Sequence, residues 1–276
     1  MKILHRQADS STTAELAEAE RALPELDDFG LAMLGVRGAD IDPATLQRAP
    51  TKEGKPNVSD DYQIATRPDG RPVFMKAVPR SVGSARKVGS LLNVAAAQGA
   101  VFASRLADRI GYPMARTELE HFDDRAWLVS DYHAGTDHSP NIGLLYRDAI
   151  RNPEMVRARP IFNALLGGRT ASSSEGIVDA ATGEYLAIDT AIMLGVTDED
   201  VSQDDMRSRL TEINNGETFE FTADMAGLMK ELEAALHDDS LNDVFRDIIG
   251  PASEGARHAG SVRARAQALV ALYHEG

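Results

Sequence analysis

The sequence contains no cysteine, which excludes disulfide bonds, thiolate nucleophiles and cysteine-based zinc or iron–sulfur sites. It has no apolar run close to the roughly 18–20 residues of a membrane-spanning helix, and residues 1–11 lack the apolar region of a secretory signal peptide. Basic residues are few, since 29 Lys and Arg stand against 43 Asp and Glu. A protein that binds nucleic acid needs a basic face. We therefore expect a soluble protein with no membrane span and no nucleic-acid partner, either cytoplasmic or exported without a Sec signal.

The chain is long enough, at 276 residues with 43% hydrophobic residues, for one two-lobed domain or two small domains. Thr12 and Glu15 have the spacing of a capping box and predict a short helix that Pro24 ends. Residues 49–61 are polar and contain two prolines and a glycine, which is typical of a boundary.

The periodicity then changes from segment to segment. Two apolar runs, 62–66 and 73–78, flank the turn Pro68-Asp69-Gly70 and predict a β-hairpin. Phe102, Leu106 and Ile110 predict a helix that ends near Gly111. The later segments are predicted strands at 114–121, 126–131, 176–179 and 184–189, and predicted helices at 141–150, at 160–166 and through most of the C-terminal third. In that third, three apolar stripes at helical spacing run through residues 225–236, 241–248 and 262–273. An acidic run over 198–205 predicts a helix start. This order indicates an α+β protein.

Two charged residues, one within a predicted strand and one at the end of another, are candidates for a functional site. Lys76 interrupts an apolar strand, where it is either an exposed residue or a cation that reaches a phosphate. Asp189 follows a buried run, where it is either a turn or N-cap aspartate or an oxygen ligand of Mg²⁺.

The segment from Ile161 to Asp189 carries a family resemblance, because its apolar start, its Thr182-Gly183 pair and its final Ile-Asp follow one known pattern. It resembles the catalytic core of phosphatidylinositol 3-/4-kinase-related and HipA-like kinases. Residues 100–111, 111–117 and 127–135 resemble the family's helix, its entry into the next strand and its hinge. The resemblance covers about residues 54–195.

The resemblance implies a two-lobed, kinase-like α+β fold. Its small β-sheet lobe with one helix would span 49–132, a mainly helical lobe 133–276, and a helical extension 1–48. ATP would lie between the lobes with its phosphates at Lys76 and Mg²⁺ at Glu175 and Asp189. The polar segment that contains Ser59 would cover the phosphates, and the adenine would lie near the segment from Val129 through Asp131 to Tyr132.

The sequence departs from the family at several functional positions. Thr170 stands where the family has its catalytic aspartate, Glu175 where it has a metal-binding asparagine, and Ala100 where a helix glutamate pairs with the strand lysine. Ala171 and Ser172 replace an arginine and a histidine. Two functions therefore remain open. One is an ATP-dependent phosphoryl or nucleotidyl transferase that acts on a protein or small molecule. The other is an inactive pseudokinase that serves as a binding or regulatory module.

Two further groups of residues were considered. Arg80, Arg86 and Lys87 either reach a phosphate or an acidic partner or belong to a solvated loop. His133 and His138 match no zinc spacing and are predicted to be surface residues after the hinge.

Overall fold

The structure is a computed structural model, and it describes residues 37–49, 61–78, 94–123, 125–136, 150–168, 175–188, 201–238, 240–245 and 252–275. The predicted helix at 12–23 and the loop with Arg80, Arg86 and Lys87 lie outside the described residues, as does the predicted helix at 141–150 except for Ile150, which is not helical.

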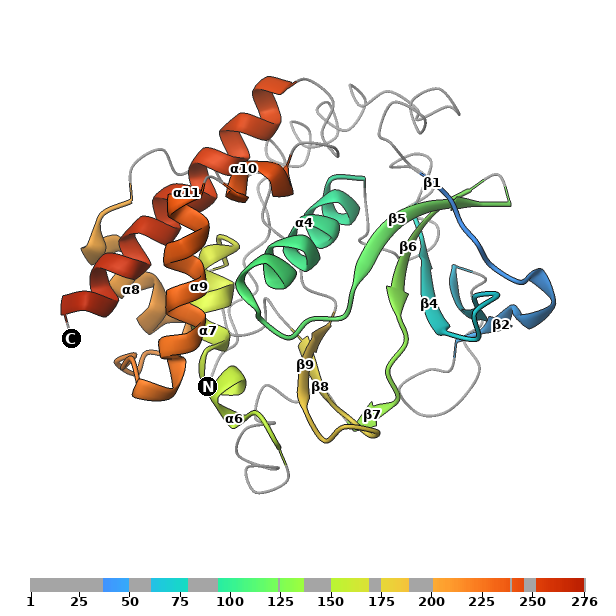
Figure 1. Ribbon diagram of the computed structural model, residues 1–276, viewed down its shortest axis with the longest axis horizontal. Helices are drawn as coiled ribbons and strands as arrows, with labels where there is room; N and C mark the ends of the chain where they lie inside the picture. The colour runs from blue at the N-terminus through green and yellow to red at the C-terminus, as the bar shows by residue number, and fades with distance from the viewer. Residues whose placement is uncertain are drawn as a thin grey trace, which may run out of the picture.

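A six-stranded sheet forms one end of the molecule (Figure 1). Its strands are β1 (Arg37–Gly38), β2 (Gln47–Arg48), β3 (Tyr62–Thr66), β4 (Pro72–Ala77), β5 (Thr117–Phe122) and β6 (Arg125–Asp131). They lie in the order β1-β5-β6-β4-β3-β2, and all neighbours are antiparallel except β1 and β5. The predicted hairpin is β3–β4, and Gly70 in its turn adopts the positive φ of 86° that glycine tolerates best.

Residues 37–48 differ from the predicted helical extension. They form β1, a 3-10 turn at Pro43–Thr45 and β2, and thereby add a strand to each edge of the sheet. Ile41 is buried against the sheet, so this segment is part of the sheet's own core. Two-residue strands carry no periodicity of their own, which is why the sequence pattern did not indicate them.

Helix α4 (Val94–Ile110) lies between the sheet and the other helices (Figure 1). Phe102, Leu106 and Ile110, which predicted this helix by their spacing, are buried. They belong to the large hydrophobic cluster that continues from the sheet into the C-terminal helices. Gly111 ends α4 with a φ of 69°, as its place after the last apolar residue predicted.

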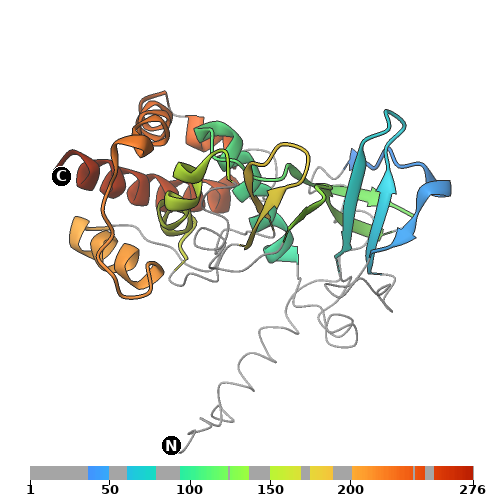
Figure 2. The same cartoon turned by 90° about the horizontal axis from the view of Figure 1, so that it is seen from below.

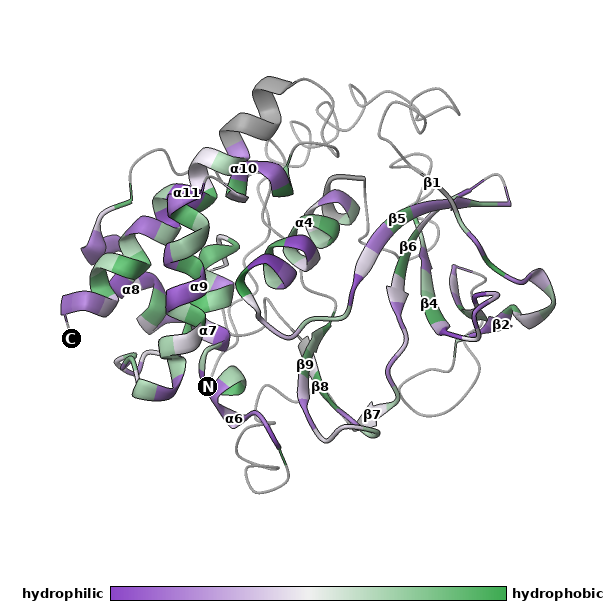
Figure 3. Cartoon of the chain, in the orientation of Figure 1, coloured by the Kyte–Doolittle hydropathy of each residue, from purple (hydrophilic) through white to green (hydrophobic). Residues whose placement is uncertain are grey.

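The C-terminal part is mainly helical, and its helices meet along their hydrophobic residues (Figure 3). The described helices there are α6 (Pro153–Arg157), α7 (Arg159–Leu165), α8 (Gln203–Ile213), α9 (Ala226–His237), α10 (Ser240–Val244) and α11 (Ala252–Glu275). Helix α8 begins where the acidic run predicted it, with Ser202 and Asp205 forming a capping box. The buried Leu228 and Leu232 of α9 and Leu269 of α11 confirm two of the predicted apolar stripes.

A second, three-stranded sheet lies between the large sheet and the helices in both views (Figures 1 and 2). It contains β7 (Gly135–Thr136), β8 (Glu175–Asp179) and β9 (Tyr185–Ile188). Ala187 joins it to the chain entering β5, because its amide donates to the Pro113 carbonyl and its carbonyl accepts from the Ala115 amide.

These elements confirm the α+β class, with a β-rich part followed by a mainly helical part. Among the described residues, no helix is both long enough and apolar enough to cross a membrane.

Candidate functional site

Lys76 lies on β4, where alternate residues face opposite sides of the sheet. Val73, Met75 and Ala77 are buried in one cluster with the neighbouring strands. Phe74 and Lys76 are half-buried and belong to the other face. Lys76 is opposite Leu128 of β6, which packs in the same cluster as α4, so Lys76 shares its face of the sheet with that helix.

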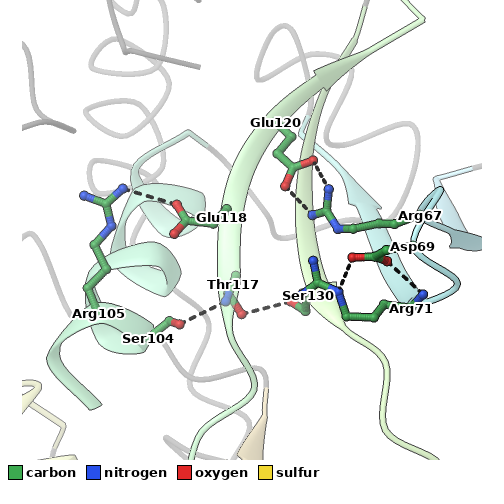
Figure 4. Close-up of polar contacts among 9 residues, drawn as sticks. All are labelled: Arg67, Asp69, Arg71, Ser104, Arg105, Thr117, Glu118, Glu120 and Ser130. Atoms are coloured by element: carbon green, nitrogen blue, oxygen red, sulfur yellow. Dashed lines mark hydrogen bonds and ion pairs between the residues drawn. The ribbon is translucent and has the colours of Figure 1, made fainter. Parts of the chain in front are cut away.

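In the six-stranded sheet, strand alternation assigns the acidic residues to the opposite face from Lys76. Glu118 and Glu120 of β5 are opposite Val129 and Trp127, two members of the buried cluster behind β4. Arginines hold these carboxylates, as Figure 4 shows: Arg105 donates to Glu118 at 3.2 Å, and Arg67 makes two bonds of 3.2 and 2.5 Å to Glu120. The Glu120 hydrogen bond raises the pKa of Arg67 above its ordinary value.

The acidic residues at the ends of β3 and β6 are also directed away from the Lys76 face. Asp61 accepts a hydrogen bond of 2.7 Å from Arg125, whose guanidinium lies over the Trp127 ring. Asp131 is two residues from Val129 along β6 and therefore on the same face of the sheet. Within the described six-stranded sheet, alternation thus puts no carboxylate on the Lys76 face, while Glu118 of β5 reaches Arg105 of α4, the helix that covers that face.

The hinge residues of the sequence prediction do not join Lys76 on one face. Val129 is only 2% exposed and packs in the cluster on the far side of the sheet from Lys76. Asp131 lies on the same side as Val129. The hydrogen bond to Glu120 is the main cause of the raised pKa of Arg67, and the negative charge of Asp131 raises this pKa further. Leu128 and Ser130, the alternate residues of β6, lie on the Lys76 side.

Helix α4 brings no counterpart of the family's pairing glutamate. Ala100, at that position of the pattern, is 5% exposed and packed in the core. The one acidic residue in the α4 sequence is Asp108, an exposed residue near its C-terminal end.

The hairpin β8–β9 carries the predicted metal ligands. Glu175, the first residue of β8, pairs with Ile188, the last residue of β9 and the one before Asp189 in the chain. The hairpin register therefore brings the backbone of Glu175 to the end of β9 that leads to Asp189. The side chain of Glu175 and all of Asp189, Thr170 and Ser59 lie outside the described residues. Within the described part of the chain, no group of three acidic or histidine residues could hold a metal ion.

His133 has a specific partner that the sequence did not indicate. Its Nδ1 lies 2.8 Å from Oδ2 of Asp179, and Asp179 is 8% exposed. The second oxygen, Oδ1, accepts hydrogen bonds from the backbone amides of Thr182 and Ala181 at 2.8 and 2.9 Å. Asp179 thus ties the segment after β6 to the β8–β9 turn. His138, the other predicted surface histidine, lies outside the described residues.

Replacing Asp179 with alanine is expected to lower the free energy of unfolding by about 1–3 kcal/mol, because several donors in the turn would lose their acceptor. The Thr182 amide, more than His133, lowers the pKa of Asp179. A lowered carboxyl pKa contributes stability above the unfolded-state pKa, and this contribution is lost as pH falls through the folded-state value. Urea unfolding at pH 7 and at about pH 3 measures it: the wild type should lose more stability on acidification than Asp179→Ala, and equal losses would contradict the assignment.

Asn163 of α7 is the other unusual polar residue. It is 1% exposed, and neither its side-chain nitrogen nor its oxygen has a hydrogen-bond partner. Buried amides are ordinarily paired, and nothing in the sequence pattern indicated this residue.

No protein-family model and no curated protein matches the chain. Among solved structures it is similar to a proinflammatory kinase, CtkA, of Helicobacter pylori, with a TM-score of 0.47 and 10% identity over 87% of this chain and 96% of that one. It is also similar to a Shewanella oneidensis MR-1 toxin–antitoxin complex of HipA, HipB and operator DNA, with a TM-score of 0.41 and 11% identity over 97% of this chain and 72% of that one. Both TM-scores are below 0.5, so the likeness carries no argument about this chain. At these TM-scores it gives no residue of this chain a role, so each residue is judged by its own contacts.

Proposed function

We propose that this protein binds ATP with Mg²⁺ and acts as a divergent phosphoryl or nucleotidyl transferase on a protein or a small molecule. One observation carries the proposal: Lys76 lies on a half-buried face of the six-stranded sheet, and alternation assigns the carboxylates of that sheet to the other face. An anion placed beside Lys76 would meet its positive charge. A lysine ammonium is a compact point charge suited to phosphate oxygens.

The residues present fit a nucleotide with a metal ion. Lys76 would hold phosphate, and Glu175 and Asp189 would supply the hard oxygen ligands that Mg²⁺ prefers. The register of Glu175 with Ile188 supports this pair, because Ile188 directly precedes Asp189 in the chain. The metal ion would offset the negative charge that phosphoryl transfer develops. The segment with Ser59 remains our candidate for contacts to the phosphates. The stretch from Val129 to Asp131 remains our candidate for the adenine through its backbone, since the side chains of Val129 and Asp131 lie on the other face of the sheet.

The same protein could instead be a pseudokinase, and two observations favour that alternative. Thr170 cannot accept a proton from a substrate hydroxyl as an aspartate does, and α4 supplies no acid to Lys76. General-base assistance contributes about 10²–10⁴-fold to a rate. Its loss leaves a slow transferase, because phosphoryl transfer depends mainly on positioning and charge.

ATP with Mg²⁺ is expected to raise the melting temperature of the wild type. At a concentration about 100 times the dissociation constant, binding adds about 2.7 kcal/mol to the free energy of unfolding. Lys76→Met should weaken ATP binding about tenfold or more, since a hydrogen bond to a charged group contributes about 1.5–3 kcal/mol. Lys230→Met, a change of an exposed lysine on α9, is the matched control and should leave the shift intact. Absence of any wild-type shift at millimolar nucleotide would refute the proposal, and a shift that survives Asp189→Ala would refute the metal assignment.

A second experiment separates the two functions. The protein is incubated with α- and γ-labelled ATP, Mg²⁺ or Mn²⁺ and a host lysate. Transfer of γ-label indicates a phosphoryl transferase and transfer of α-label a nucleotidyl transferase, provided that Asp189→Ala abolishes it. Nucleotide binding without transfer of either label indicates the pseudokinase.

A further inference from the structure

We propose that Tyr62 is a positioning residue for Lys76, and that its ring does the orienting that a helix glutamate does in the family that this chain resembles. The proposal deepens the proposed function, because it concerns how the cation is presented to a nucleotide. It starts from a contact within the chain: Nζ of Lys76 lies over the Tyr62 ring, 6.0 Å from its centroid. That distance is at the outer limit of a cation–π interaction.

Strand pairing fixes this contact. Tyr62 and Lys76 are directly opposite each other on the antiparallel strands β3 and β4, and side chains in such pairs have Cβ atoms about 4.5–5.5 Å apart. A shift of one residue would move Lys76 to the other face of the sheet, but the apolar residues on that face, Val73, Met75 and Ala77, are buried. The register that buries the core therefore also places the ammonium group beside the ring.

Two contacts fix Tyr62, one at its ring and one at its backbone. Phe74 packs near Tyr62 with a centroid distance of 6.3 Å and an interplanar angle of 33°. The backbone of Tyr62 is fixed by the amide of Ala49, which donates a hydrogen bond of 2.9 Å to its carbonyl. Both Tyr62 and Phe74 are half-buried, so the ring presents a partly desolvated face to Lys76.

A ring orients a lysine differently from a carboxylate. The negative face of the aromatic quadrupole attracts the ammonium group without adding a formal charge. A glutamate would neutralise much of the cation, and it would also repel the phosphates that bind there. On the face of the six-stranded sheet that carries Lys76, Tyr62 of the neighbouring strand supplies this aromatic contact. Tyr62 thus restricts the lysine without adding a negative charge beside it.

The contact has a spectroscopic signature that needs no nucleotide. In protein labelled with ¹³C-lysine, the ε-methylene resonances of Lys76, assigned with Lys76→Arg, should show an upfield ring-current shift. Tyr62→Phe keeps a ring and should keep this shift, whereas Tyr62→Leu should abolish it. Phe74→Leu removes the neighbouring ring on the same face and serves as the matched control that leaves the shift largely in place. Absence of the shift from the wild type, or its survival in Tyr62→Leu, would overturn the proposal.

The role in binding is tested with ATP and Mg²⁺ by calorimetry. Tyr62→Leu should raise the dissociation constant about two- to fivefold, Tyr62→Phe should restore wild-type binding, and adenosine binding should not respond to either change. In a Lys76→Met background Tyr62→Leu should have no further effect, because the ring acts through the lysine. An equal loss in both backgrounds would show a merely structural ring and overturn the role. If the wild type binds no ATP, the proposed function fails and the positioning role fails with it, but the ring-current shift would still report the contact.

Discussion

Replacing Glu120 with alanine is expected to lower the free energy of unfolding by about 3 kcal/mol, because removing one partner of a buried ion pair leaves the other charge uncompensated. Glu120 and Arg67 are 11% and 18% exposed at their side chains, and two hydrogen bonds join them. Without Glu120, the guanidinium of Arg67 would remain between β5 and the β3–β4 hairpin with no acceptor at those two bonds (Figure 4). Urea unfolding followed by circular dichroism measures the loss.

Glu118 is the matched control, because it lies two residues away on the same strand and the same face. Its partner is Arg105, and the two side chains are 31% and 32% exposed. Exposed pairs contribute about 0.2–1 kcal/mol, so Glu118→Ala should cost about 1 kcal/mol or less. Replacing both members of the buried pair, with Glu120→Leu and Arg67→Met, should cost less than Glu120→Ala alone. Equal losses for the two glutamates would show that burial does not govern these pairs.

The sequence predicted most of the elements that carry strong periodicity. The hairpin around Asp69-Gly70, the helix through Phe102 and the C-terminal apolar stripes are all present. The failures lie where periodicity is weak. The two-residue strands β1 and β2 are held by pairing with β5 and β3, and long-range pairing leaves no local pattern in two residues. The sequence also did not indicate helix α6, because its five residues are too few to show a helical apolar period.

The sequence indicated which residues belong to the candidate site, but not which face of the sheet each side chain occupies. Lys76 was identified from its strand, yet the sequence pattern alone assigned no side of the sheet to Val129 and Asp131. Counting the register outward from the turn would place Tyr62 opposite Lys76, since Thr66 pairs with Pro72. It would not have revealed which arginines bind the strand carboxylates, because those arginines come from a turn, a helix and another strand. Contacts between distant elements of this kind depend on the folded backbone.

Replacing Gly176 with alanine is expected to destabilise the protein by about 3 kcal/mol, at the upper end of the cost of overpacking. Tyr185 of β9 lies diagonally across from Gly176 of β8, and its ring covers the glycine. A Cβ at residue 176 would lie 2.8 Å from both Cζ and Oη of Tyr185, and closer still to Cε2. The Tyr185 ring is fully buried, so it cannot move aside without disturbing its neighbours.

Gly260→Ala is the matched control for the same chemical change. Gly260 is an exposed residue inside α11, and no heavy atom lies within 4 Å of a Cβ placed there. Alanine is favoured over glycine in a helix by about 0.5–1 kcal/mol, so this variant should be more stable than the wild type. The two glycines are thus expected to respond with opposite sign in the same urea titration.

A second-site change tests whether the clash is the cause. Tyr185→Leu removes the ring atoms that a Cβ at residue 176 would meet. In that background Gly176→Ala should cost much less than in the wild type, which is the coupling that a double-mutant cycle measures for residues in contact. Because Gly176 follows Glu175 in β8, the clash should also displace the hairpin end that we propose holds the metal ion. The ATP-dependent rise in melting temperature should then fall in Gly176→Ala and remain in Gly260→Ala. A Gly176→Ala protein as stable as the wild type would show that the hairpin accommodates a side chain there, and would contradict the close packing of Tyr185 on β8.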